Sequence, residues 1–340
     1  MTPIGLDIGG AHLKASDGQS AVSIPFALWK SPEQLPSALR QLLASYSKQA
    51  PLAVTMTGEL ADCFATRTEG VRHILKSVQT AAGLQAIWIW QTGGEFLTVD
   101  EAWELTDLVA AANWHALATW AARMSPAGRS LIIDIGSTTS DFTCIEEGLP
   151  APRGSTDRER LTTGELLYLG VRRTPLCAVA HSVRLRDQQV ACAREVFATT
   201  LDLGLLLGEI DETPDNFATA NGRPATRAHA ADRLARMLCS DCTDLTAEEL
   251  QAIAREMAAE CRRLVADSLT RAWGQTARPE RILLAGEGEF LARQTLQAEF
   301  PDWKDVETLS LASLWGAARS QAACAEALSR LASERLVQGQ

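Results

Sequence analysis

Two short stretches of the chain each place an aspartate at the end of an apolar run and follow it with glycine and small polar residues. They are "IGLDIGGAHLKA" at residues 4–15 and "LIIDIGSTTSDF" at residues 131–142. Glycine lets a backbone approach a phosphate closely because no Cβ intervenes, and successive N–H groups in such a turn form an anion-binding concavity. A carboxylate beside the phosphates can hold Mg²⁺, which keeps several waters and takes only one or two carboxylates. The two stretches together predict a site for a phosphate chain and Mg²⁺.

The residues behind this prediction form a metal group and a phosphate group. We expect Asp7 and Asp134 to hold Mg²⁺, with Asp141 behind them. A lone Asp-x-Gly is equally typical of an ordinary β-turn, but two copies and a third glycine-rich strand end favour the phosphate site. Neither a Walker loop nor a Rossmann fingerprint is present. The predicted phosphate cradle comprises Gly9, Gly10, Thr57, Gly58, Gly136, Ser137, Thr138, Thr139 and Gly286.

The wide separation of the two stretches indicates a duplicated α/β unit rather than a solenoid repeat. A chain of 340 residues is long enough for two lobes. Within the first lobe we expect one long helix from Asp100, as its N-cap, to Arg123. The predicted organisation is a first lobe at 1–127, a second lobe at 128–309 with a mostly helical insertion at about 186–274, and a C-terminal helix within 310–340 that packs back on the first lobe.

The composition is that of an acidic globular protein. Its formal net charge is −10, which argues against a general nucleic-acid or anionic-membrane binder. No apolar run reaches the roughly 18 residues of a membrane helix, and the N-terminus lacks the basic segment of a secretory signal. We therefore expect a cytoplasmic protein whose partner is a small phosphorylated molecule. The helical segment at 186–274 could cover the site or form a homodimer contact.

The eight cysteines are scattered along the chain and are expected to be reduced thiols. One CxxC pair, Cys239 and Cys242, has no second pair at zinc spacing and no preceding strand. We interpret this pair as structural, with a redox or metal role as the alternative.

The motifs in combination resemble the hydantoinase A/oxoprolinase-like family of the acetate kinase, sugar kinase, heat-shock and actin superfamily. Within that family the chain is most similar to the branch that serves tetrahydromethanopterin-linked C1 metabolism. The resemblance implies a duplicated actin/hexokinase-like (ribonuclease H-like) α/β fold of two lobes with a central cleft. It covers most of the chain and rests on "GLDIGGAHLKA", "VTMTGELAD", "VAAANWHALA", "IIDIGSTTSDF", "TTGELLYLGVRRTPL" and "NFATANGRPATRAHAADRLARMLCSD".

The resemblance implies a transferase of methanofuran or methylofuran synthesis. The implied enzyme joins an aminomethyl-furanmethyl diphosphate to the phenol oxygen of a glutamyltyramine, tyramine or tyrosine-derived unit and releases diphosphate. The leaving group needs charge neutralisation, for which Mg²⁺ and oriented N–H groups are suited. A phenol has an unperturbed pKa of about 10, so a base must accept its proton. Our first candidate for this base is Glu59 and the second is Glu165, while Lys14 is expected to pair with a phosphate.

Several of these residues have a second interpretation. Lys14 could be a surface lysine, and Glu59 could cap the helix that follows it. Asn113 lies within an Ala-rich helical segment and is expected to reach substrate. Arg223 and Arg227 in "NGRPATR" could clamp a carboxylate or phosphate.

The alternative function is an ATP-dependent one, either a small-molecule kinase or an amidohydrolase of the oxoprolinase type. In nucleotide-binding relatives the third glycine-rich strand end lies near the adenosine. Here this strand end reads "AGEGEF", and the carboxylates of Glu287 and Glu289 would repel phosphates unless a cation intervened. ATP is therefore not the favoured ligand. A third alternative is a non-catalytic protein that senses nucleotides.

Overall fold

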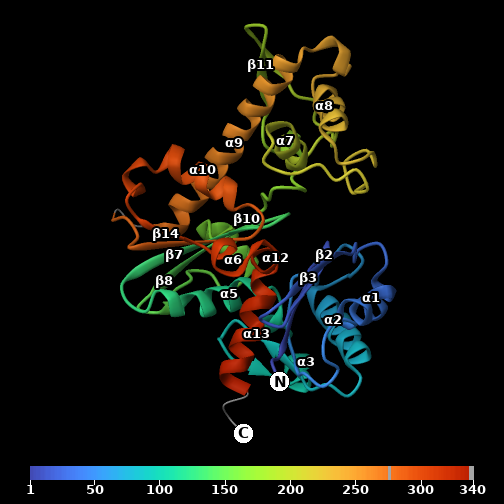
Figure 1. Cartoon of the computed structure of the whole chain (residues 1–340), viewed down its shortest axis with the longest axis vertical. Helices are drawn as coiled ribbons and strands as arrows, with labels where there is room; N and C mark the ends of the chain where they lie inside the picture. Colours follow the sequence, from blue (N-terminus) through green and yellow to red (C-terminus); the bar gives the residue numbers. More distant parts are fainter. Residues whose placement is uncertain (275–276, 337–340) are drawn as a thin grey trace.

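Two mixed β-sheets flanked by helices form the body of the molecule, as the computed structural model of residues 1–274 and 277–336 shows (Figure 1). The first sheet has the order β3 (Ala21–Pro25), β2 (His12–Ser16), β1 (Ile4–Ile8), β4 (Leu52–Met56), β5 (Ile87–Trp90) and β6 (Phe96–Leu97). The second has the order β10 (Leu166–Leu167), β8 (Ser140–Glu146), β7 (Arg129–Ile135), β13 (Arg281–Ala285) and β14 (Glu307–Ser310), with β9 (Leu149–Pro150) paired to β8.

The two sheets repeat one pattern of strand pairing. In the first, β1 is antiparallel to β2 and parallel to β4, and β4 is parallel to β5. In the second, β7 is antiparallel to β8 and parallel to β13, and β13 is parallel to β14. The repeat places Asp7 opposite Lys14 and Asp134 opposite Asp141 in the two hairpins. The predicted duplicated two-lobed α/β fold is therefore confirmed.

The helices of the first lobe show why its strands are buried. Helix α1 (Leu35–Leu43) turns four leucines inward, and α2 (Arg67–Ala82) packs beside it. All five residues of β1 and of β4 are buried, as expected for central strands covered on both faces.

The single long helix expected from Asp100 to Arg123 is wrong. The segment forms α3 (Val99–Glu104), α4 (Thr106–Val109) and α5 (Asn113–Ala121), and the first N-cap is Thr98, whose side chain forms a capping box with Glu101. The helix breaks because Ala110 pairs with Met56 in a parallel bridge and Ala111 has a φ of 50°. This break brings the start of α5 beside the end of β4.

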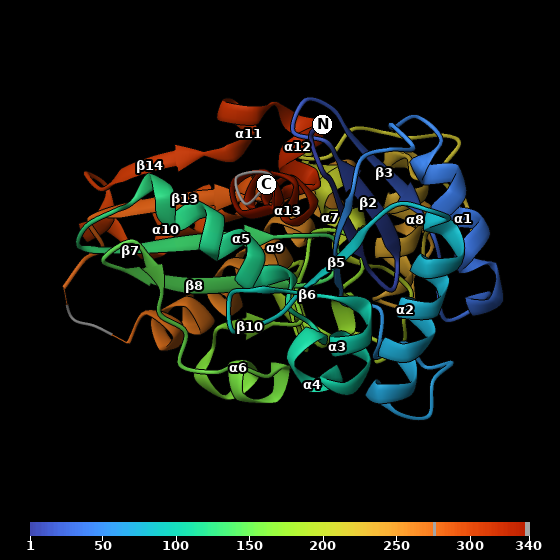
Figure 2. The ribbon, with the colours of Figure 1, turned by 90° about the horizontal axis from the view of Figure 1, so that it is seen from below.

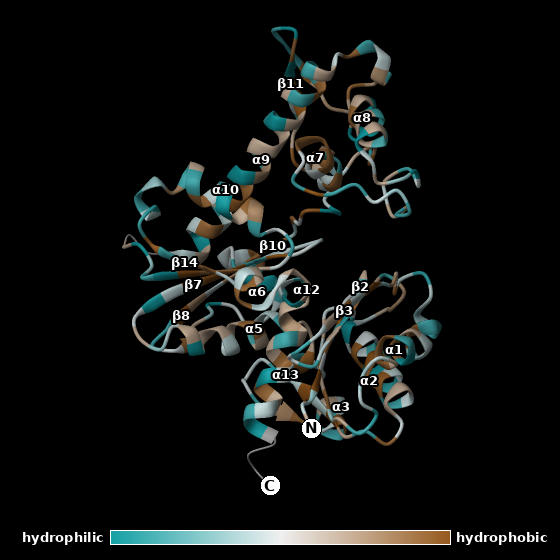
Figure 3. Ribbon diagram, viewed as in Figure 1, coloured by the Kyte–Doolittle hydropathy of each residue, from teal (hydrophilic) through white to brown (hydrophobic). Residues whose placement is uncertain are grey.

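Helices of the second lobe include α6 (Asp157–Thr163) and α10 (Glu289–Glu299). An extension rises from this lobe and contains α7 (Thr200–Leu207), α8 (Arg227–Arg236) and the upper part of α9 (Ala247–Trp273) (Figure 1). Polar and apolar residues alternate along α9 (Figure 3), whose apolar side chains lie in the large core of the second lobe. A fully buried ion pair, with 2.7 Å between Arg233 and Asp202, joins α8 to α7.

The extension also contains a hairpin that the sequence did not reveal. Strands β11 (Ser182–Leu185) and β12 (Gln188–Ala191) are antiparallel, and the two residues between them, Arg186 and Asp187, have φ values of 49° and 61°. Positive φ at both central residues is typical of a tight hairpin turn. Part of the range expected to be mostly helical is thus a β-hairpin.

The chain ends with α11 (Leu311–Trp315), α12 (Ala317–Gln321) and α13 (Ala323–Leu336). Helix α13 lies between the lobes and contacts both β1 and α5 (Figures 1 and 2). Its Glu326 is fully buried, accepts a hydrogen bond from Ser16 on β2 and pairs with Arg330 at 2.7 Å. All eight cysteines are free thiols. Among the described residues, no helix combines the length and hydropathy needed to cross a membrane.

The approach of α13 to β1 predicts a strong effect of one added methyl group. A Cβ on Gly5 would lie 1.9 Å from the carbonyl oxygen of Ala325, so the helix would have to move. We expect Gly5→Ala to lower the free energy of unfolding by about 1–3 kcal/mol or more, as overpacking does. Chemical denaturation measures this change.

Gly10→Ala is the matched control, because a Cβ there meets no atom within 4 Å. Equal stability losses in the two variants would contradict the packing of α13 on β1.

Candidate functional site

Each of the two predicted turns is closed by one backbone hydrogen bond, at equivalent positions. In the first, the N–H of Gly9 donates to the carbonyl of His12 at 3.0 Å, and in the second the N–H of Gly136 donates to that of Thr139 at 2.9 Å. Among the described residues, the N–H groups at four other turn positions make no intramolecular hydrogen bond, and so can meet an anion. These positions are Gly10, Ser137, Thr138 and Thr139.

The remaining cradle residues lie against these turns. The N–H groups of Thr57 and Gly58 donate to the carbonyl of Ile8 at 2.9 and 3.0 Å, so the end of β4 crosses beside the first turn. A Cβ on Gly58 would lie 3.2 Å from the carbonyl carbon of Gly9. A Cβ on Gly286 would lie 2.5 Å from an oxygen of Asp134. The structure thus gathers the predicted phosphate-binding residues around the two aspartates.

The charges of the two hairpins lie close enough to shift each other's pKa values. Burial raises the pKa of Asp7, Lys14 lowers it and Asp141 raises it further. Burial raises the pKa of Asp134 to about 7, with Asp141 adding to the rise and Lys14 opposing it. Burial acts to lower the pKa of Lys14, but Asp7, Cys324 and Asp134 outweigh it and raise that pKa. Lys14 is half-buried and lies directly opposite Asp7 in the hairpin, which contradicts a role as a surface lysine.

Asp7 has the features expected of a metal ligand. It is 5% exposed, and its Oδ1 has no hydrogen-bond partner among the described residues; nor has the Oγ1 of Thr55, its register partner on β4. A buried carboxylate oxygen without a partner is costly unless a ligand or ion satisfies it. Within the described chain, no group of three His, Cys, Asp or Glu side chains is arranged for a metal. The partnerless oxygen of Asp7 supplies the single carboxylate contact that Mg²⁺, which keeps most of its waters, needs from a protein.

The third predicted metal ligand, Asp141, is placed differently. Its Oδ1 lies 2.7 Å from an NH of Arg160, which is 1% exposed. Arg160 also donates to the carbonyl of Glu165 at 3.1 Å, and its guanidinium lies 3.9 Å from the ring centroid of Trp114. Asp141 is thus neutralised by an arginine from α6 and is not assigned to the metal. Sequence reasoning missed Arg160, because its partner is 19 residues away and on a different element.

Glu59, the first candidate base, is 1% exposed and follows β4. One of its oxygens lies 3.6 Å from Arg67, and the other has no partner among the described residues. Burial raises the pKa of Glu59 to about 7, even though Arg67 acts to lower it. The alternative that Glu59 caps the next helix is contradicted, because Thr66 is the N-cap of α2 and accepts from the N–H of Glu69.

Glu165, the second candidate base, has a structural role. One carboxylate oxygen accepts from the N–H of Arg153 at 2.8 Å. The other accepts from the N–H of Gly154 at 2.9 Å and from the hydroxyl of Thr163 at 2.6 Å. With both oxygens occupied and the side chain 1% exposed, Glu165 holds a loop and is not assigned as a base.

The predicted substrate residues do not all gather at the hairpins. Asn113 begins α5, directly before Trp114, and is half-buried. Arg223 is 63% exposed and pairs with Asp232 at 3.8 Å in the extension, where both line a pocket of about 350 Å³. Arg227 is exposed at the start of α8 and donates to the carbonyl of Leu205. No described contact joins either arginine to the paired hairpins.

The two carboxylates that follow β13 also have partners within the protein. Glu287 pairs with Arg172 at 2.6 Å, and Glu289 accepts hydrogen bonds from Ser310, Ala312 and Ser320. The expected repulsion of phosphates by these two carboxylates is therefore weaker than the sequence indicated. Beside Arg172, the guanidinium of Arg173 lies 4.7 Å from the ring centroid of Trp29, which joins the two lobes.

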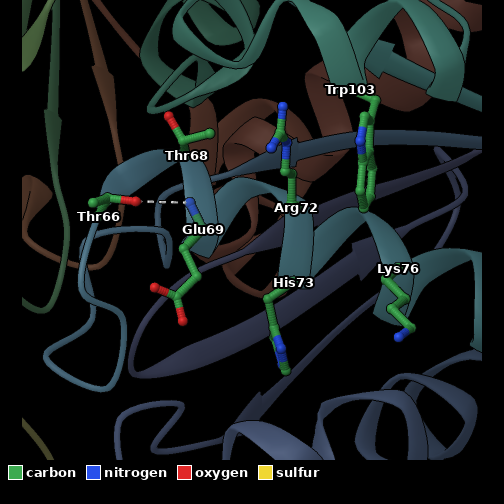
Figure 4. Close-up of a pocket in the computed structure, with 7 residues that line it drawn as sticks. All are labelled: Thr66, Thr68, Glu69, Arg72, His73, Lys76 and Trp103. Carbon is green, nitrogen blue, oxygen red and sulfur yellow. Dashed lines mark hydrogen bonds between the residues drawn. The ribbon is translucent and has the colours of Figure 1, made fainter.

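A second pocket, of about 400 Å³, lies along α2 and α3 rather than at the hairpins (Figure 4). The guanidinium of Arg72 lies 5.5 Å from the ring centroid of Trp103, and the close-up shows the two side chains next to each other. The lining residues contain none of the predicted site residues; they are Thr66, Thr68, Glu69, Arg72, His73, Lys76 and Trp103.

The raised pKa of Asp134 predicts a gain in stability from neutralising it. The folded state favours its protonated form, so the stability of the metal-free protein falls as the pH rises from about 4 through about 7. We expect Asp134→Asn to remove this fall and to raise Tm at pH 8 by roughly 2 °C or more. Thermal melts in a chelator, from pH 5 to pH 8, test this.

The exposed Asp305→Asn is the control. If wild type and Asp134→Asn keep a constant difference in Tm across this range, Asp134 does not lie in the charged, desolvated setting described.

Solved structures resemble the chain only distantly. Component A of the (R)-2-hydroxyglutaryl-CoA dehydratase of Acidaminococcus fermentans is 13% identical with a TM-score of 0.45, and 98% of each chain is covered. The archaeal actin homologue Ta0583 in complex with ADP is also 13% identical, with a TM-score of 0.47, over 98% of this chain and all of that one. At these values the resemblance carries no inference about what this chain binds.

Sequence comparisons are more informative. A (4-{4-[2-(gamma-L-glutamylamino)ethyl]phenoxymethyl}furan-2-yl)methanamine synthase from Methanocaldococcus jannaschii is 32% identical over 252 residues, which are 73% of this chain and 74% of that protein. The synthase of the same name from Methanococcus vannielii is 30% identical over 55% of this chain and 82% of that protein. The profile of the Hydantoinase/oxoprolinase family matches residues 52–321. The chain belongs to the hydantoinase/oxoprolinase family.

Proposed function

We propose that the protein is a transferase of methanofuran or methylofuran synthesis. It condenses an aminomethyl-furanmethyl diphosphate with the phenol of a glutamyltyramine, tyramine or tyrosine-derived unit and releases diphosphate. The names of the two synthase relatives, which describe a phenoxymethyl-furan, support this reaction. The observation that carries the proposal is the combination of two glycine turns, with Lys14 between their aspartates, and a buried carboxylate with a raised pKa, Glu59.

The turns suit a diphosphate leaving group. As the bond from the furanmethyl carbon to oxygen breaks, negative charge grows on the diphosphate. The N–H groups of Gly10, Ser137 and Thr138 make no described hydrogen bond within the protein. They lie in turns that are already closed, so they can donate hydrogen bonds to the growing negative charge without reorganisation. The ammonium of Lys14 adds a positive charge beside them.

Asp7 and Asp134 would hold Mg²⁺, whose chemistry there is to neutralise the diphosphate. The partnerless oxygen of Asp7 is the feature that fits this ion. A carboxylate must be ionised to bind a metal. Because the pKa of Asp134 is about 7, a nearby cation would readily favour its ionised form at neutral pH.

Glu59 serves as the general base. The phenol must lose its proton as it attacks, and a base with a pKa near the working pH accepts a proton most effectively. Burial raises the pKa of Glu59 to about 7, and its second oxygen is without a partner in the described chain. Arg67, 3.6 Å from the other oxygen, orients the carboxylate.

ATP-dependent chemistry, by a kinase or an oxoprolinase-type amidohydrolase, is the second candidate function. One observation favours it: the pairing of Glu287 with Arg172 reduces the repulsion that would keep a nucleotide phosphate away. The first test below therefore includes ATP.

The coupling reaction itself is the direct test. Incubated with Mg²⁺, the aminomethyl-furanmethyl diphosphate and tyramine, the protein should release diphosphate and form the aryl ether without ATP. We expect Asp7→Asn and Asp134→Asn each to lower kcat/KM by at least about a hundredfold, because charge stabilisation of this kind contributes about 10²–10³. Mass spectrometry of the ether and a diphosphate assay measure both.

Product that forms only when ATP is added would favour the second candidate function instead. Near-normal activity in either variant would remove that aspartate from the metal site. Asp305→Asn is again the matched control.

The pH dependence of kcat/KM tests whether Glu59 is the general base. Its carboxylate form accumulates above its pKa of about 7, so kcat/KM should rise with pH through about 7 and then level off. Glu59→Gln should abolish this rise and lower the rate by about 10²–10⁴-fold. The exposed Glu104→Gln is the control. A rise that persists in Glu59→Gln would show that another group is the base.

A further inference from the structure

A second cluster of charged and aromatic side chains lies outside the phosphate turns. We call it the acidic–aromatic cluster and define it by Glu59, Asp141, Asp157, Tyr168 and Trp114. Its members come from the loop after β4, from β8, from the first turn of α6, from the residue after β10, and from α5. Sequence reasoning assigned no function to Asp157 or Tyr168.

Strand register and direct contacts bring these residues together. Leu166, two residues before Tyr168, lies opposite Asp141, and Arg160, three residues after Asp157 in α6, contacts both Asp141 and the ring of Trp114. The charge coupling agrees with this placement. Burial and then Asp141 raise the pKa of Asp157, while Arg67 and Arg160 lower it. Burial raises the pKa of Tyr168, with further contributions from Asp157, Glu59 and Asp141. Asp157 also raises the pKa of Glu59, from the opposite lobe. The cluster therefore spans the junction between the lobes. Figure 2 shows α6 on the same side of the molecule as β10 and α4.

The positive charges nearby do not balance the carboxylates. Arg160 is engaged by Asp141 and by the face of Trp114. Arg67 is 3.6 Å from Glu59. With all three carboxylates ionised, Asp157 is the negative charge left over: its side chain has no hydrogen bond or ion pair in the described part of the chain, although it is half-buried.

One deeply buried acceptor in the same cluster, the Oε2 of Glu59, has no partner among the described residues, and its residue is 1% exposed. The Nε1 of Trp114 and the Nε atoms of Arg67 and Arg160 have none either, but they are donors that a cation cannot satisfy. Unsatisfied buried groups of this kind are uncommon in native proteins and indicate a missing ligand. Tyr168 is 55% exposed and directly follows β10, which pairs with β8 at Asp141.

We propose that the acidic–aromatic cluster binds a primary ammonium group of a substrate, with Asp157 as its main ionic partner and Tyr168 as an aromatic wall. An ammonium has three donors and one positive charge, which match the free acceptors and the excess of one carboxylate. Aromatic faces attract such cations. A metal ion fits less well, because two arginines already lie within the cluster.

The ammonium group can belong to either of two molecules. Only this choice of molecule rests on the proposed function. One is the aminomethyl group of the furan diphosphate and the other is the amine of a bare tyramine. Both have the same recognition chemistry. In either case Asp157 is a specificity residue: it would align the amine-bearing substrate so that its other end meets the phosphate turns or Glu59.

Binding measurements without turnover test this inference independently of the reaction. Isothermal titration calorimetry would compare tyramine with 4-ethylphenol, and [5-(aminomethyl)furan-3-yl]methanol with (5-methylfuran-3-yl)methanol. Each pair differs by an ammonium group. We expect one amine to bind wild type at least about tenfold more tightly than its neutral counterpart, as a charge-assisted hydrogen bond provides. Asp157→Asn should remove that preference, and Asp157→Glu should restore part of it.

The matched control is Asp100→Asn. Asp100 and Asp157 both lie in the first turn of a helix with a capping box, but Asp100 is exposed and outside the cluster. A preference for either amine that depends on Asp157 supports the proposal and identifies the source. The proposal is overturned if neither amine is preferred, or if the preference survives Asp157→Asn in a protein with wild-type circular dichroism. Either result stands whether or not the coupling reaction is found.

Discussion

The buried charges of Asp7, Lys14 and Asp134, which act on one another's pKa values, are the constraint from which the arrangement of the two lobes is best understood. Two carboxylates are drawn out of water at the ends of central strands, where like charges repel and burial favours their neutral forms. One lysine on a neighbouring strand offsets both. Because Asp7 and Lys14 belong to one lobe and Asp134 to the other, the offset is complete only when both sheets are brought together. Helix α13, packed on β1 and α5, holds them there.

Burying these like charges lowers the stability of the fold, which points to a functional reason for keeping them. An asparagine in place of Asp134 would relieve both desolvation and repulsion, so stability alone gives no reason for the aspartate. Residues that violate the usual rules of burial are expected at functional sites. The same holds for the partnerless oxygens of Asp7, at the end of β1, and of Glu59, just after β4.

The sequence was sufficient for features that depend on local pattern. Each Asp-Ile-Gly stretch could be assigned to a strand and turn, and the repeat of this stretch predicted the duplicated sheets. Features that depend on distant partners could not be found in this way. Nothing near Asp141 in the sequence indicates that Arg160 neutralises it, and nothing near Glu165 shows that loop N–H groups occupy its oxygens. The break before α5 escaped prediction because it depends on a bridge between Ala110 and Met56, far apart in the chain.

The duplication also explains how one site acquires two chemically different halves. At the position opposite the strand-end aspartate, the first hairpin carries Lys14 and the second carries Asp141. A positive charge at this position suits phosphates, whereas a negative charge requires a counter-ion, which α6 supplies through Arg160. Arg160 also stacks on Trp114, and Asp157, in the same helix as Arg160, raises the pKa of Glu59. A single charge reversal between equivalent strands thus separates a region suited to an anion from a region suited to a cation. Such a separation would serve the proposed reaction, in which a diphosphate leaves while an amine-bearing substrate is held.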